Sequence, residues 1–251
     1  LVSEVMLQQT SVARVKPKYE AFLDAFPTPG ALAKAPLGDA LRLWSGLGYP
    51  RRCRNLQATA VVLHEQFDDN MPETLDELLK LPGIGQYTAR AVLAFAHRID
   101  VAVVDVNVSR VLSRLEGVPM KARALQDFAD ELVPQGLGWE WNQVMMDFGA
   151  RHCTVRSPQC DSCPVRSQCR YKGVGEDPAQ LSAGVSKPQA RFEGSDRQAR
   201  GRAMKAVSSG AMNINDVVEA MRVEEQRALA LIASLVNEGL LQRTDAIITL
   251  P

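Results

Sequence analysis

The sequence predicts a mainly α-helical protein in two parts, and three observations support this prediction. Apolar residues recur every three to four positions over most of the chain, as they do along one face of an α-helix. Proline and glycine clusters separate these stretches by short turns. Residues 172–189 are rich in Gly, Ser, Pro and Ala and lack periodicity, which indicates a linker. We therefore expect a helical domain over residues 1–171 and a smaller domain over residues 190–251.

The periodicity predicts each helix in chain order. The expected helices of the first domain are 5–26 with an interruption at Pro17, 39–45, 52–67, 74–80, 87–97, 107–115, 122–133 and 141–150. Residues 101–106 form a short apolar run that favours a strand. After the linker, residues 196–207, 214–221 and 224–237 predict three helices, and residues 246–250 favour a strand. Three helices and a terminal hairpin are the order of a winged helix-turn-helix, although many small three-helix units share this pattern.

The composition is that of a globular protein. Of its 251 residues 46% are hydrophobic and 23% are charged, which excludes wholesale disorder, collagen-like repeats and coiled-coil rods. No apolar run approaches the ~18 residues of a membrane span, and residues 1–9 lack a basic leader, so we expect a cytoplasmic protein without a membrane partner. Lys plus Arg equals Asp plus Glu at 29 each, so the net charge does not indicate nucleic acid. Residues 41–64 nevertheless hold four Arg and no acid, a pattern that also fits a solvated face.

Four of the five cysteines lie close together in the sequence. Cys153, Cys160, Cys163 and Cys169 have the spacing C-x6-C-x2-C-x5-C, whereas Cys53 is distant and is expected to be an ordinary thiol. Structural zinc sites more often pair two C-x2-4-C knuckles, and only one is present here. A cubane iron-sulfur cluster tolerates uneven spacing because each Cys binds a different iron. We therefore favour a [4Fe-4S] cluster over the alternatives, a zinc site and unligated thiols.

Residues 81–89, L-P-G-I-G-Q-Y-T-A, lie between two predicted helices. Gly83 and Gly85 permit a tight turn whose backbone N–H groups can approach a phosphate closely, aided by the dipole of the next helix. A helix-hairpin-helix contacts DNA in this way without reading sequence. The alternative is an ordinary interhelical turn without a ligand.

Three polar side chains are candidates for chemistry. Asp105 and Asn107 stand between the short apolar run and the next predicted helix, where either side chain could simply cap that helix. Glu4 is a carboxyl in an apolar-rich helical stretch, although a helical Glu is usually exposed to solvent.

Together these features resemble the endonuclease III-like superfamily of base-excision DNA glycosylases, and more closely the MutY-type adenine glycosylases. The resemblance covers residues 1–171 and rests on S-E-V-M-L-Q-Q-T at 3–10, W-S-G-L-G-Y at 44–49, L-P-G-I-G-Q-Y-T-A at 81–89, V-D-V-N-V at 104–108, N-Q-V-M-M-D-F-G-A at 142–150 and the cysteine cluster. It implies a helix-hairpin-helix glycosylase fold with a [4Fe-4S] loop at 153–169, followed by the small winged-helix-like unit.

The resemblance also implies a role for each catalytic candidate. Glu4 would protonate adenine at N7 and then handle the attacking water, while Asp105 would stay ionised and stabilise the sugar cation. Asn107 would position water or Asp105, and Tyr87 would line the site near the sugar. In the bifunctional glycosylase/lyases the position of Tyr87 is a Lys that forms a Schiff base, so a phenol predicts a monofunctional enzyme.

The target base must leave the duplex to reach both carboxyls, so DNA contacts are expected as well. By resemblance, Gln9 and Tyr49 would be the wedging residues, with Gln8 and Thr10 nearby at the mismatch. The hairpin would bind the backbone through Gly83, Gly85 and Gln86. The expected phosphate contacts are Arg51, Arg52 and Arg54, with a further basic surface on the iron-sulfur loop at Arg151, Arg156, Arg166 and Arg170. The expected partner is double-stranded DNA with a mismatched adenine, bound by a monomer associated with the nucleoid.

The chain departs from the family pattern at several points. Pro50 replaces a second aromatic residue of many relatives, and Val106 replaces a Gly. Many MutY-type enzymes carry a Nudix-like C-terminal domain that inspects 8-oxoguanine, whereas the shorter segment here predicts a winged helix.

Three functional hypotheses remain. The first is excision of adenine opposite 8-oxoguanine or guanine. The second is a sister enzyme that removes thymine from T·G mismatches, which shares the Glu, Tyr, Asp and Cys features but tends to have basic residues in place of Gln8 and Gln9. The third is a non-catalytic iron-sulfur DNA-binding regulator, which the intact Glu4 and Asp105 disfavour.

Overall fold

The chain forms two compact units in the computed structural model, which describes residues 1–184 and 191–251. Unit 1 comprises Leu1–Pro72, Lys80–Gly83 and Gln189–Pro251, and unit 2 comprises Glu73–Leu79 and Ile84–Pro188. The last part of the predicted linker, 185–189, and residue 190, where the C-terminal domain is predicted to begin, lie outside the described residues. The division of the chain at residues 171 and 190 stays a prediction.

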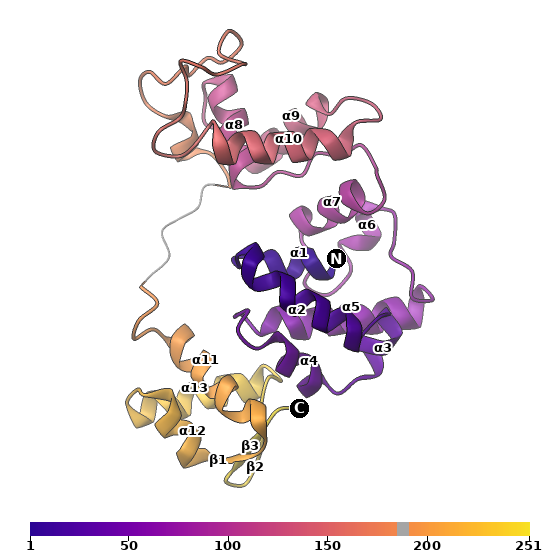
Figure 1. Cartoon of the computed structure of the whole chain (residues 1–251), viewed down its shortest axis with the longest axis vertical. Helices are drawn as coiled ribbons and strands as arrows, with labels where there is room; N and C mark the ends of the chain where they lie inside the picture. Colours follow the sequence, from indigo (N-terminus) through magenta and orange to yellow (C-terminus); the bar gives the residue numbers. More distant parts are fainter. Residues whose placement is uncertain (185–190) are drawn as a thin grey trace. The chain divides into compact units, whose positions relative to one another are not determined.

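The first part of unit 1 is a series of helices (Figure 1). They are α1 Val2–Leu7, α2 Val12–Ala25, α3 Pro29–Lys34, α4 Leu37–Trp44 and α5 Arg51–Gln66. The interruption expected at Pro17 lies instead at residues 8–11, because Gln9 adopts a left-handed backbone conformation with φ +56°. Pro17 itself lies inside α2, which continues past it and buries Val15 and Phe22 on one face.

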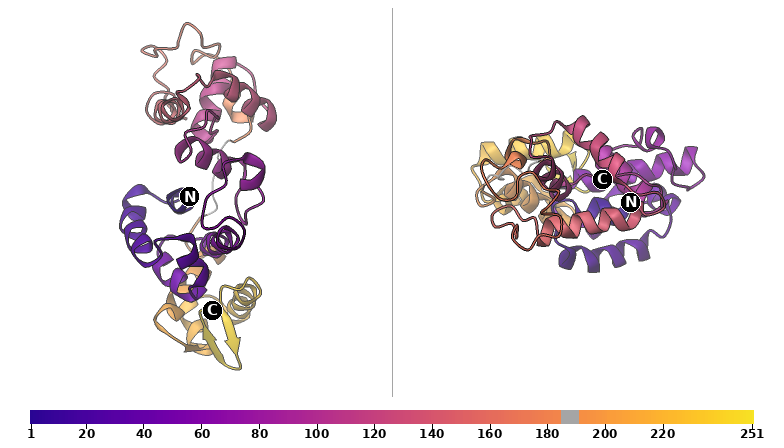
Figure 2. Two further views of the ribbon diagram at one scale, coloured as in Figure 1. Left: turned by 90° about the vertical axis from the view of Figure 1, so that its right-hand side faces the viewer. Right: turned by 90° about the horizontal axis from the view of Figure 1, so that it is seen from above.

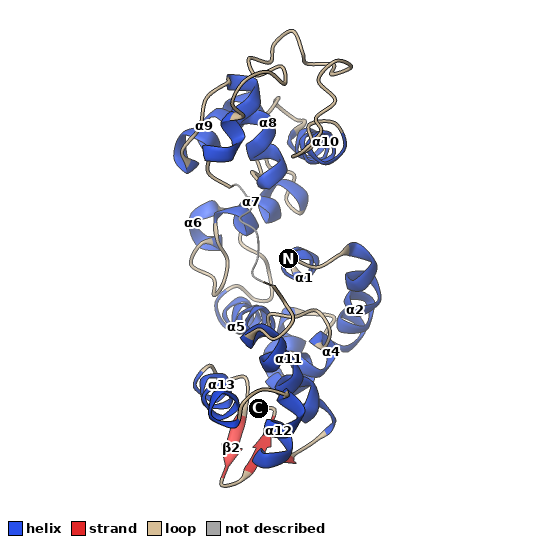
Figure 3. Cartoon of the chain, turned by 90° about the vertical axis from the view of Figure 1, so that its left-hand side faces the viewer, coloured by secondary structure: helices blue, strands red, loops and turns tan. Residues whose placement is uncertain are grey.

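The C-terminal part of unit 1 contains three helices and a small sheet, as predicted (Figure 3). The elements are α11 Asp196–Ala206, a 3-10 turn at Val207–Ser209, β1 Met212–Asn213, α12 Ile214–Met221, α13 Glu225–Asn237, β2 Gln242–Thr244 and β3 Ile247–Thr249. The strands are antiparallel in the order β1-β3-β2. Ile248 of the central strand β3 pairs with Met212 of β1 on one side and with Arg243 of β2 on the other. The arrows of the β2–β3 hairpin lie side by side in the left view of Figure 2. Strand β1 was not predicted because two residues are too short for a periodic signal.

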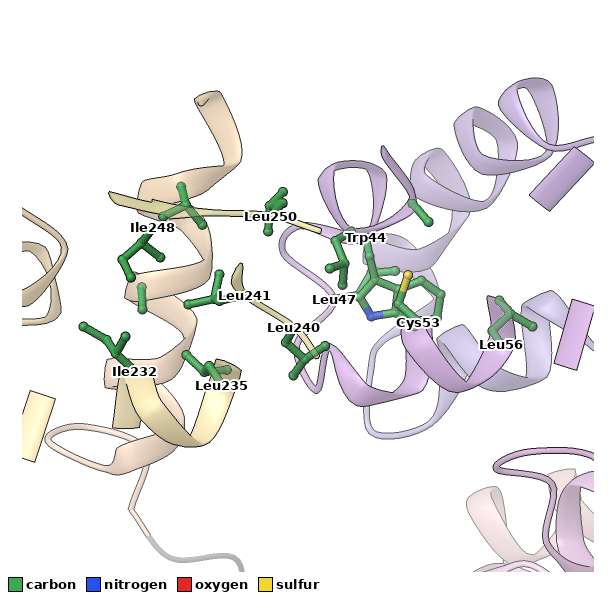
Figure 4. Packing of buried hydrophobic residues seen from close by; sticks show 14 of the residues in the cluster. Trp44, Leu47, Cys53, Leu56, Ile232, Leu235, Leu240, Leu241, Ile248 and Leu250 are labelled. Atoms are coloured by element: carbon green, nitrogen blue, oxygen red, sulfur yellow. The ribbon is translucent and has the colours of Figure 1, made fainter. Parts of the chain in front are cut away.

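One hydrophobic core joins both parts of unit 1. Figure 4 shows Leu240 and Leu250 on the side that faces Trp44 and Leu47, and all four side chains are at most 8% exposed. Full burial of one such side chain contributes about 1.5 to 3 kcal/mol. The backbone N–H of Gly38 also donates to the carbonyl oxygen of Pro251 over 2.8 Å. The C-terminal segment therefore packs against α4 and the turn that follows it.

Unit 2 contains a second group of helices, with α8 packed against both α9 and α10 (Figure 1). Its elements are α6 Leu75–Leu78, α7 Gln86–Phe95, α8 Val106–Glu116, α9 Ala122–Leu132, α10 Gly138–Arg151 and a 3-10 turn at Pro178–Leu181. The side chains of Val108, Leu112 and Leu125 form the centre of its core. Among the described residues, no helix of the chain is both long enough and apolar enough to cross a membrane.

The strand expected at residues 101–106 is wrong. The backbone N–H of Ala102 donates to Oδ1 of Asp130 over 2.9 Å, and that of Val103 donates to Oδ1 of Asn142 over 2.7 Å. Side chains of α9 and α10 therefore take the place of a neighbouring strand, and α8 already begins at Val106. The extended apolar pattern reflects burial of the segment between helices rather than a sheet.

Candidate active site

Asp105 occupies the start of α8 as its N-cap. Its Oδ1 accepts hydrogen bonds from the backbone N–H groups of Asn107 (2.8 Å) and Val108 (2.7 Å). Its Oδ2 accepts a third hydrogen bond from Nδ2 of Asn107 over 2.9 Å. The capping role considered from the sequence is thus present. Three N–H donors therefore fix both oxygens of the Asp105 carboxyl group at the start of α8, beside the positive end of the helix dipole.

A chain of hydrogen bonds connects Asp105 to the cysteine loop through Asn107 and Arg110. Nη2 of Arg110 donates to Oδ1 of Asn107 over 2.9 Å and to the carbonyl oxygen of Gly149 over 2.6 Å. Nε of Arg110 donates to the carbonyl oxygen of Cys153 over 2.7 Å. A Cβ atom at Gly149 would lie 2.7 Å from Cβ of Asn107, so glycine lets α10 approach α8 closely. One hydrogen-bond network therefore links the Asp105 carboxyl group to the backbone of Cys153.

The four clustered cysteines line a single cavity of about 350 Å³ in unit 2. Arg114 lies beside it, only 2% exposed, with Nη1 3.4 Å from Sγ of Cys153 and an ion pair of 2.6 Å to Asp177. The thiol of Cys169 donates to the carbonyl oxygen of Arg114 over 3.3 Å. Within residues 1–184 and 191–251, no three His, Cys, Asp or Glu side chains are grouped to hold a single metal ion.

The motifs of the sequence do not single out Arg110 and Arg114, although both contribute to this hydrogen-bond network. Both stand on α8 four positions apart, in the apolar-rich sequence V-S-R-V-L-S-R-L, and both are buried. A buried arginine requires partners of opposite charge or several acceptors. Two arginines at buried helical positions were therefore the signal that could have identified them.

Glu4 lies in the first turn of α1 and is half-buried, next to the buried Val5 and Met6. Burial raises the pKa of the Glu4 carboxyl because a charged carboxylate is poorly solvated there. A carboxyl with a raised pKa keeps its proton at higher pH and can act as an acid.

Two turns of unit 1 carry the expected wedging residues. Gln9 has φ +56° and Tyr49 has φ +48°, and such left-handed conformations of residues other than glycine cost on the order of 1–3 kcal/mol each. The hydroxyl of Thr10 donates to the carbonyl oxygens of Gln8 (3.3 Å) and Leu47 (3.1 Å), which links the two turns. Strained backbone of this kind often occurs at functional sites.

The guanidinium group of Arg52 connects the turn at Gln8–Gln9 to the turn at Leu47–Tyr49. Its Nη1 donates to the carbonyl oxygens of Val5, Met6 and Gln8 at 2.6, 3.2 and 2.7 Å, and its Nη2 to those of Leu47 and Gly48 at 3.0 and 3.1 Å. The guanidinium carbon lies 5.5 Å from the ring centroids of both Trp44 and Tyr49. Arg52 therefore binds protein carbonyls in this structure, and its expected phosphate contact stays a prediction.

The glycine-rich hairpin connects α6 to α7. Gly83 has φ +76°, and a Cβ atom there would lie 2.7 Å from the side chain of Asn55, so both the conformation and the space require glycine. Gly85 is the N-cap of α7, and no described side chain caps this helix. Gly83, Gly85 and Gln86 are exposed. An exposed helix start with close backbone access is suited to binding a phosphate.

Tyr87 is the second residue of α7 and is half-buried against Ala91, Ala94 and Val103. Unit 2 contains Tyr87, Asp105, Asn107 and the four clustered cysteines, and unit 1 contains Glu4, the two turns and Arg52. Within unit 2, hydrogen bonds connect Asp105, Asn107 and Cys153 through Arg110, and within unit 1 Arg52 connects the two turns.

The fold and the hairpin define this chain as a helix-hairpin-helix DNA-repair protein. A family model described as "HhH-GPD superfamily base excision DNA repair protein" matches residues 2–135, and the chain belongs to this family.

Similar curated proteins are named adenine DNA glycosylase. The one from Mycolicibacterium smegmatis is 41% identical over 97% of this chain and 84% of its own length. The one from Mycobacterium tuberculosis is 37% identical over 97% of this chain and 82% of its length. The human protein is 40% identical over 73% of this chain and 35% of its length.

Solved structures with the same fold include a thymine-DNA glycosylase and endonuclease III. A thermostable thymine-DNA glycosylase matches with a TM-score of 0.64 and 29% identity, over 68% of this chain and 82% of that chain. Endonuclease III in a non-covalent DNA complex matches with a TM-score of 0.62 and 28% identity, over the same shares. The fold is therefore that of the endonuclease III-like glycosylases.

Proposed function

We propose that this chain is a monofunctional glycosylase that hydrolyses the N-glycosidic bond of adenine paired with 8-oxoguanine or guanine in double-stranded DNA. The observation that carries the proposal is the Asp105 carboxylate, which accepts three N–H hydrogen bonds at the start of α8. Two relatives named adenine DNA glycosylase match over 97% of the chain and support adenine as the base.

The chemistry needs negative charge beside the sugar. Departure of adenine leaves an oxocarbenium-like deoxyribose, as in the reactions of glycosidases. We assign to Asp105 the role of stabilising this cation in its ionised form, because three N–H hydrogen bonds hold its carboxyl group in one orientation. Asn107 holds the second carboxylate oxygen and is proposed to orient Asp105 or the attacking water.

The leaving base needs a proton, because an adenine anion is a poor leaving group. We assign this proton to Glu4, whose pKa is raised by burial. After departure of the base, the Glu4 carboxylate is suited to accept a proton from the attacking water. The proposal requires Glu4 and Asp105 to act on the same flipped nucleotide.

Flipping requires contacts that open the duplex and hold its backbone. We assign Gln9 and Tyr49, with their left-handed backbone conformations, to the gap left by the base. Gln8 and Thr10 are proposed to contact the mismatch. The exposed residues Gly83, Gly85 and Gln86 are proposed to bind the DNA backbone at the start of α7.

Tyr87 makes strand cleavage unexpected. A lyase needs an amine that forms a Schiff base with the sugar, and a phenol cannot form one. We therefore propose that the product is an abasic site and that Tyr87 packs near the sugar.

The cysteine loop fits an iron-sulfur cluster. Cys153, Cys160, Cys163 and Cys169 line one cavity, and each thiolate of a cubane binds a different iron. We propose that they hold a [4Fe-4S] cluster, which supplies structural order to the loop, because hydrolysis transfers no electron. The loop would then present its arginines, Arg151, Arg156, Arg166 and Arg170, to phosphates.

A second candidate function is the removal of thymine from T·G mismatches, because a thymine-DNA glycosylase shares the fold at 29% identity.

Single-turnover assays on duplexes with A opposite 8-oxoguanine, A opposite guanine and T opposite guanine separate the alternatives. We expect release of adenine only, from a monomer. Release of thymine without adenine would establish the second candidate function, and no release at all would favour a DNA-binding regulator. The proposed setting is the bacterial nucleoid, where mismatched duplex occurs.

A further inference from the structure

The ring of Tyr49 is contacted by the C-terminal segment of the same unit. Nη1 of Arg197, on α11, donates a hydrogen bond of 2.8 Å to the phenolic oxygen of Tyr49. The guanidinium carbon of Arg197 lies 5.9 Å from the centroid of the Tyr49 ring and 5.1 Å from that of Phe192. The residue proposed to enter the duplex is thus fixed at its polar tip by a residue 148 positions away.

A second contact holds the helix that follows Tyr49. The Glu238 carboxylate, at the end of α13, accepts hydrogen bonds of 2.6 Å from Nε of Arg51 and from Nη2 of Arg200. Arg54 donates to the carbonyl oxygen of Glu238. The carboxylate is only 10% exposed, and the bond from Arg51 is the main cause that lowers the pKa of Glu238 to about 2. The first turn of α5 is therefore attached to α13 through ionised groups.

The surface of α13 lacks the chemistry of a DNA-reading helix. In a winged helix-turn-helix the corresponding helix enters the major groove and needs cations for the phosphates. The sequence of α13 contains one cation, Arg227, which forms an ion pair of 2.6 Å with Asp196. The exposed residues of α13 are otherwise Glu225, Gln226, Leu229, Ala230, Ala233 and Asn237. Apart from the paired Arg227, this face is acidic, neutral polar or apolar, so it does not favour a second DNA contact.

We propose that the C-terminal segment 191–251 is a positioning element for Tyr49, with Arg197 as the positioning residue. The inference rests on the proposed function, because it takes Tyr49 as the side chain that enters the duplex. A ring that is already fixed by Arg197 and Arg52 loses less conformational freedom when DNA binds. The segment therefore raises DNA affinity through Tyr49 and without its own base contacts.

A double-mutant cycle tests this inference in the full chain. The variants are Tyr49→Phe, Arg197→Met and the double variant, and the measurement is the Kd for a duplex with a non-hydrolysable 2′-fluoro-adenosine opposite 8-oxoguanine. Each single change removes the same hydrogen bond, so we expect each to weaken binding about fivefold and the double variant to bind no more weakly than the weaker single variant. Arg197→Lys should restore part of the affinity, because an ammonium can also donate to the phenol.

Arg243→Met is the matched control. Arg243 is an exposed cation of the same segment whose Nε donates to the carbonyl oxygen of Asp245 in its own hairpin. We expect the Kd of the Arg243→Met variant for the same duplex to equal that of the wild type. Thermal unfolding checks that the variants are folded, and Tyr49→Phe keeps the test valid even where Arg197→Met is destabilised, because it removes only the phenolic hydroxyl.

Several outcomes would overturn the inference. Effects of the two single changes that multiply in the double variant would show independent roles. The slope of log Kd against log salt concentration is a second readout. If Arg197→Met lowers this slope by about one, Arg197 contacts a phosphate directly. An unchanged Kd of Tyr49→Ala would remove both the wedge role and the inference. A wild-type chain that binds DNA but releases no adenine contradicts the proposed function alone, and the cycle still decides the role of Arg197.

Discussion

Nδ2 of Asn107 donates a hydrogen bond of 2.9 Å to Oδ2 of Asp105, whereas the backbone N–H groups of α8 donate to Oδ1. Both oxygens of Asp105 thus face N–H donors, and Asn107 is in turn fixed by Arg110. The local sequence V-D-V-N therefore supplies both a helix cap and a carboxyl group held in one orientation. These two roles respond differently to mutation.

Asp105→Asn should separate the structural role from the chemical one. Asn is as good an N-cap as Asp, but its Nδ2 would face the donor Nδ2 of Asn107, so we expect the free energy of unfolding to fall by about 1 to 3 kcal/mol through loss of that one hydrogen bond. The neutral amide cannot stabilise a sugar cation, so single-turnover excision should slow on the order of 100-fold or more. Thermal unfolding and excision measured on the same preparation check both statements. An excision rate within tenfold of wild type would leave Asp105 with the capping role alone.

Excision should depend on pH through Glu4. Burial raises the pKa of this carboxyl above its ordinary value of 4.5, and the proposed reaction needs the protonated form. The rate should therefore fall as pH rises through the raised pKa, by about tenfold per pH unit above it. A pH profile of single-turnover rates for the wild type and Glu4→Gln measures this. A Glu4→Gln variant that keeps the same descending limb would assign the titration to another group.

Tyr87→Lys should introduce lyase chemistry. A lysine amine at the second residue of α7 could form a Schiff base with the sugar, as in the bifunctional relatives. We expect borohydride to trap a covalent protein–DNA adduct with Tyr87→Lys and none with the wild type. Denaturing gel electrophoresis of labelled duplex detects the adduct. Absence of any adduct from a folded, DNA-binding variant would show that position 87 lies away from the sugar.

Cys160→Ser should remove the proposed cluster. The purified wild type should be brown and contain iron, and the variant should lose the visible absorbance and part of its DNA affinity. Cys53→Ala is the control, because Cys53 is buried in unit 1 and burial raises its pKa to about 12, so it stays a neutral thiol. Metal analysis and the absorption spectrum provide the measurement. A colourless wild type with stoichiometric zinc would replace the cluster with a zinc site.

Much of the fold could be predicted from the sequence, since helical periodicity and turn residues are local signals. The helices near residues 52–67, 107–115 and 214–221 agree with α5, α8 and α12. The strand prediction for residues 101–106 was wrong because an apolar run indicates burial and not pairing with another strand. Side chains of helices α9 and α10 accept the backbone hydrogen bonds that a neighbouring strand would have accepted. Helix α2 continued past Pro17, and the break came at Gln9, whose left-handed conformation has no clear signal in its residue type.

The candidate site shows the same division between local and distant contacts. The cap at Asp105 and the cysteine cluster follow from neighbouring residues, so the sequence indicates both. The arginines at 51, 52 and 54 looked like a phosphate-binding patch, but their partners in unit 1 include Glu238 and the carbonyl oxygens of two separate turns. The contacts of Arg51 and Arg54 with Glu238 span 187 and 184 positions, and contacts between residues so far apart leave no periodic trace in a single sequence.

The central claim is that Glu4 and Asp105 serve one reaction on one nucleotide. Single-turnover release of adenine opposite 8-oxoguanine by Glu4→Gln, Asp105→Asn and the double variant tests it most directly. Groups that act as a unit are strongly non-additive, so the double variant should be about as slow as the slower single variant. Losses that multiply in the double variant, or a near-normal rate in either single variant, would contradict the claim.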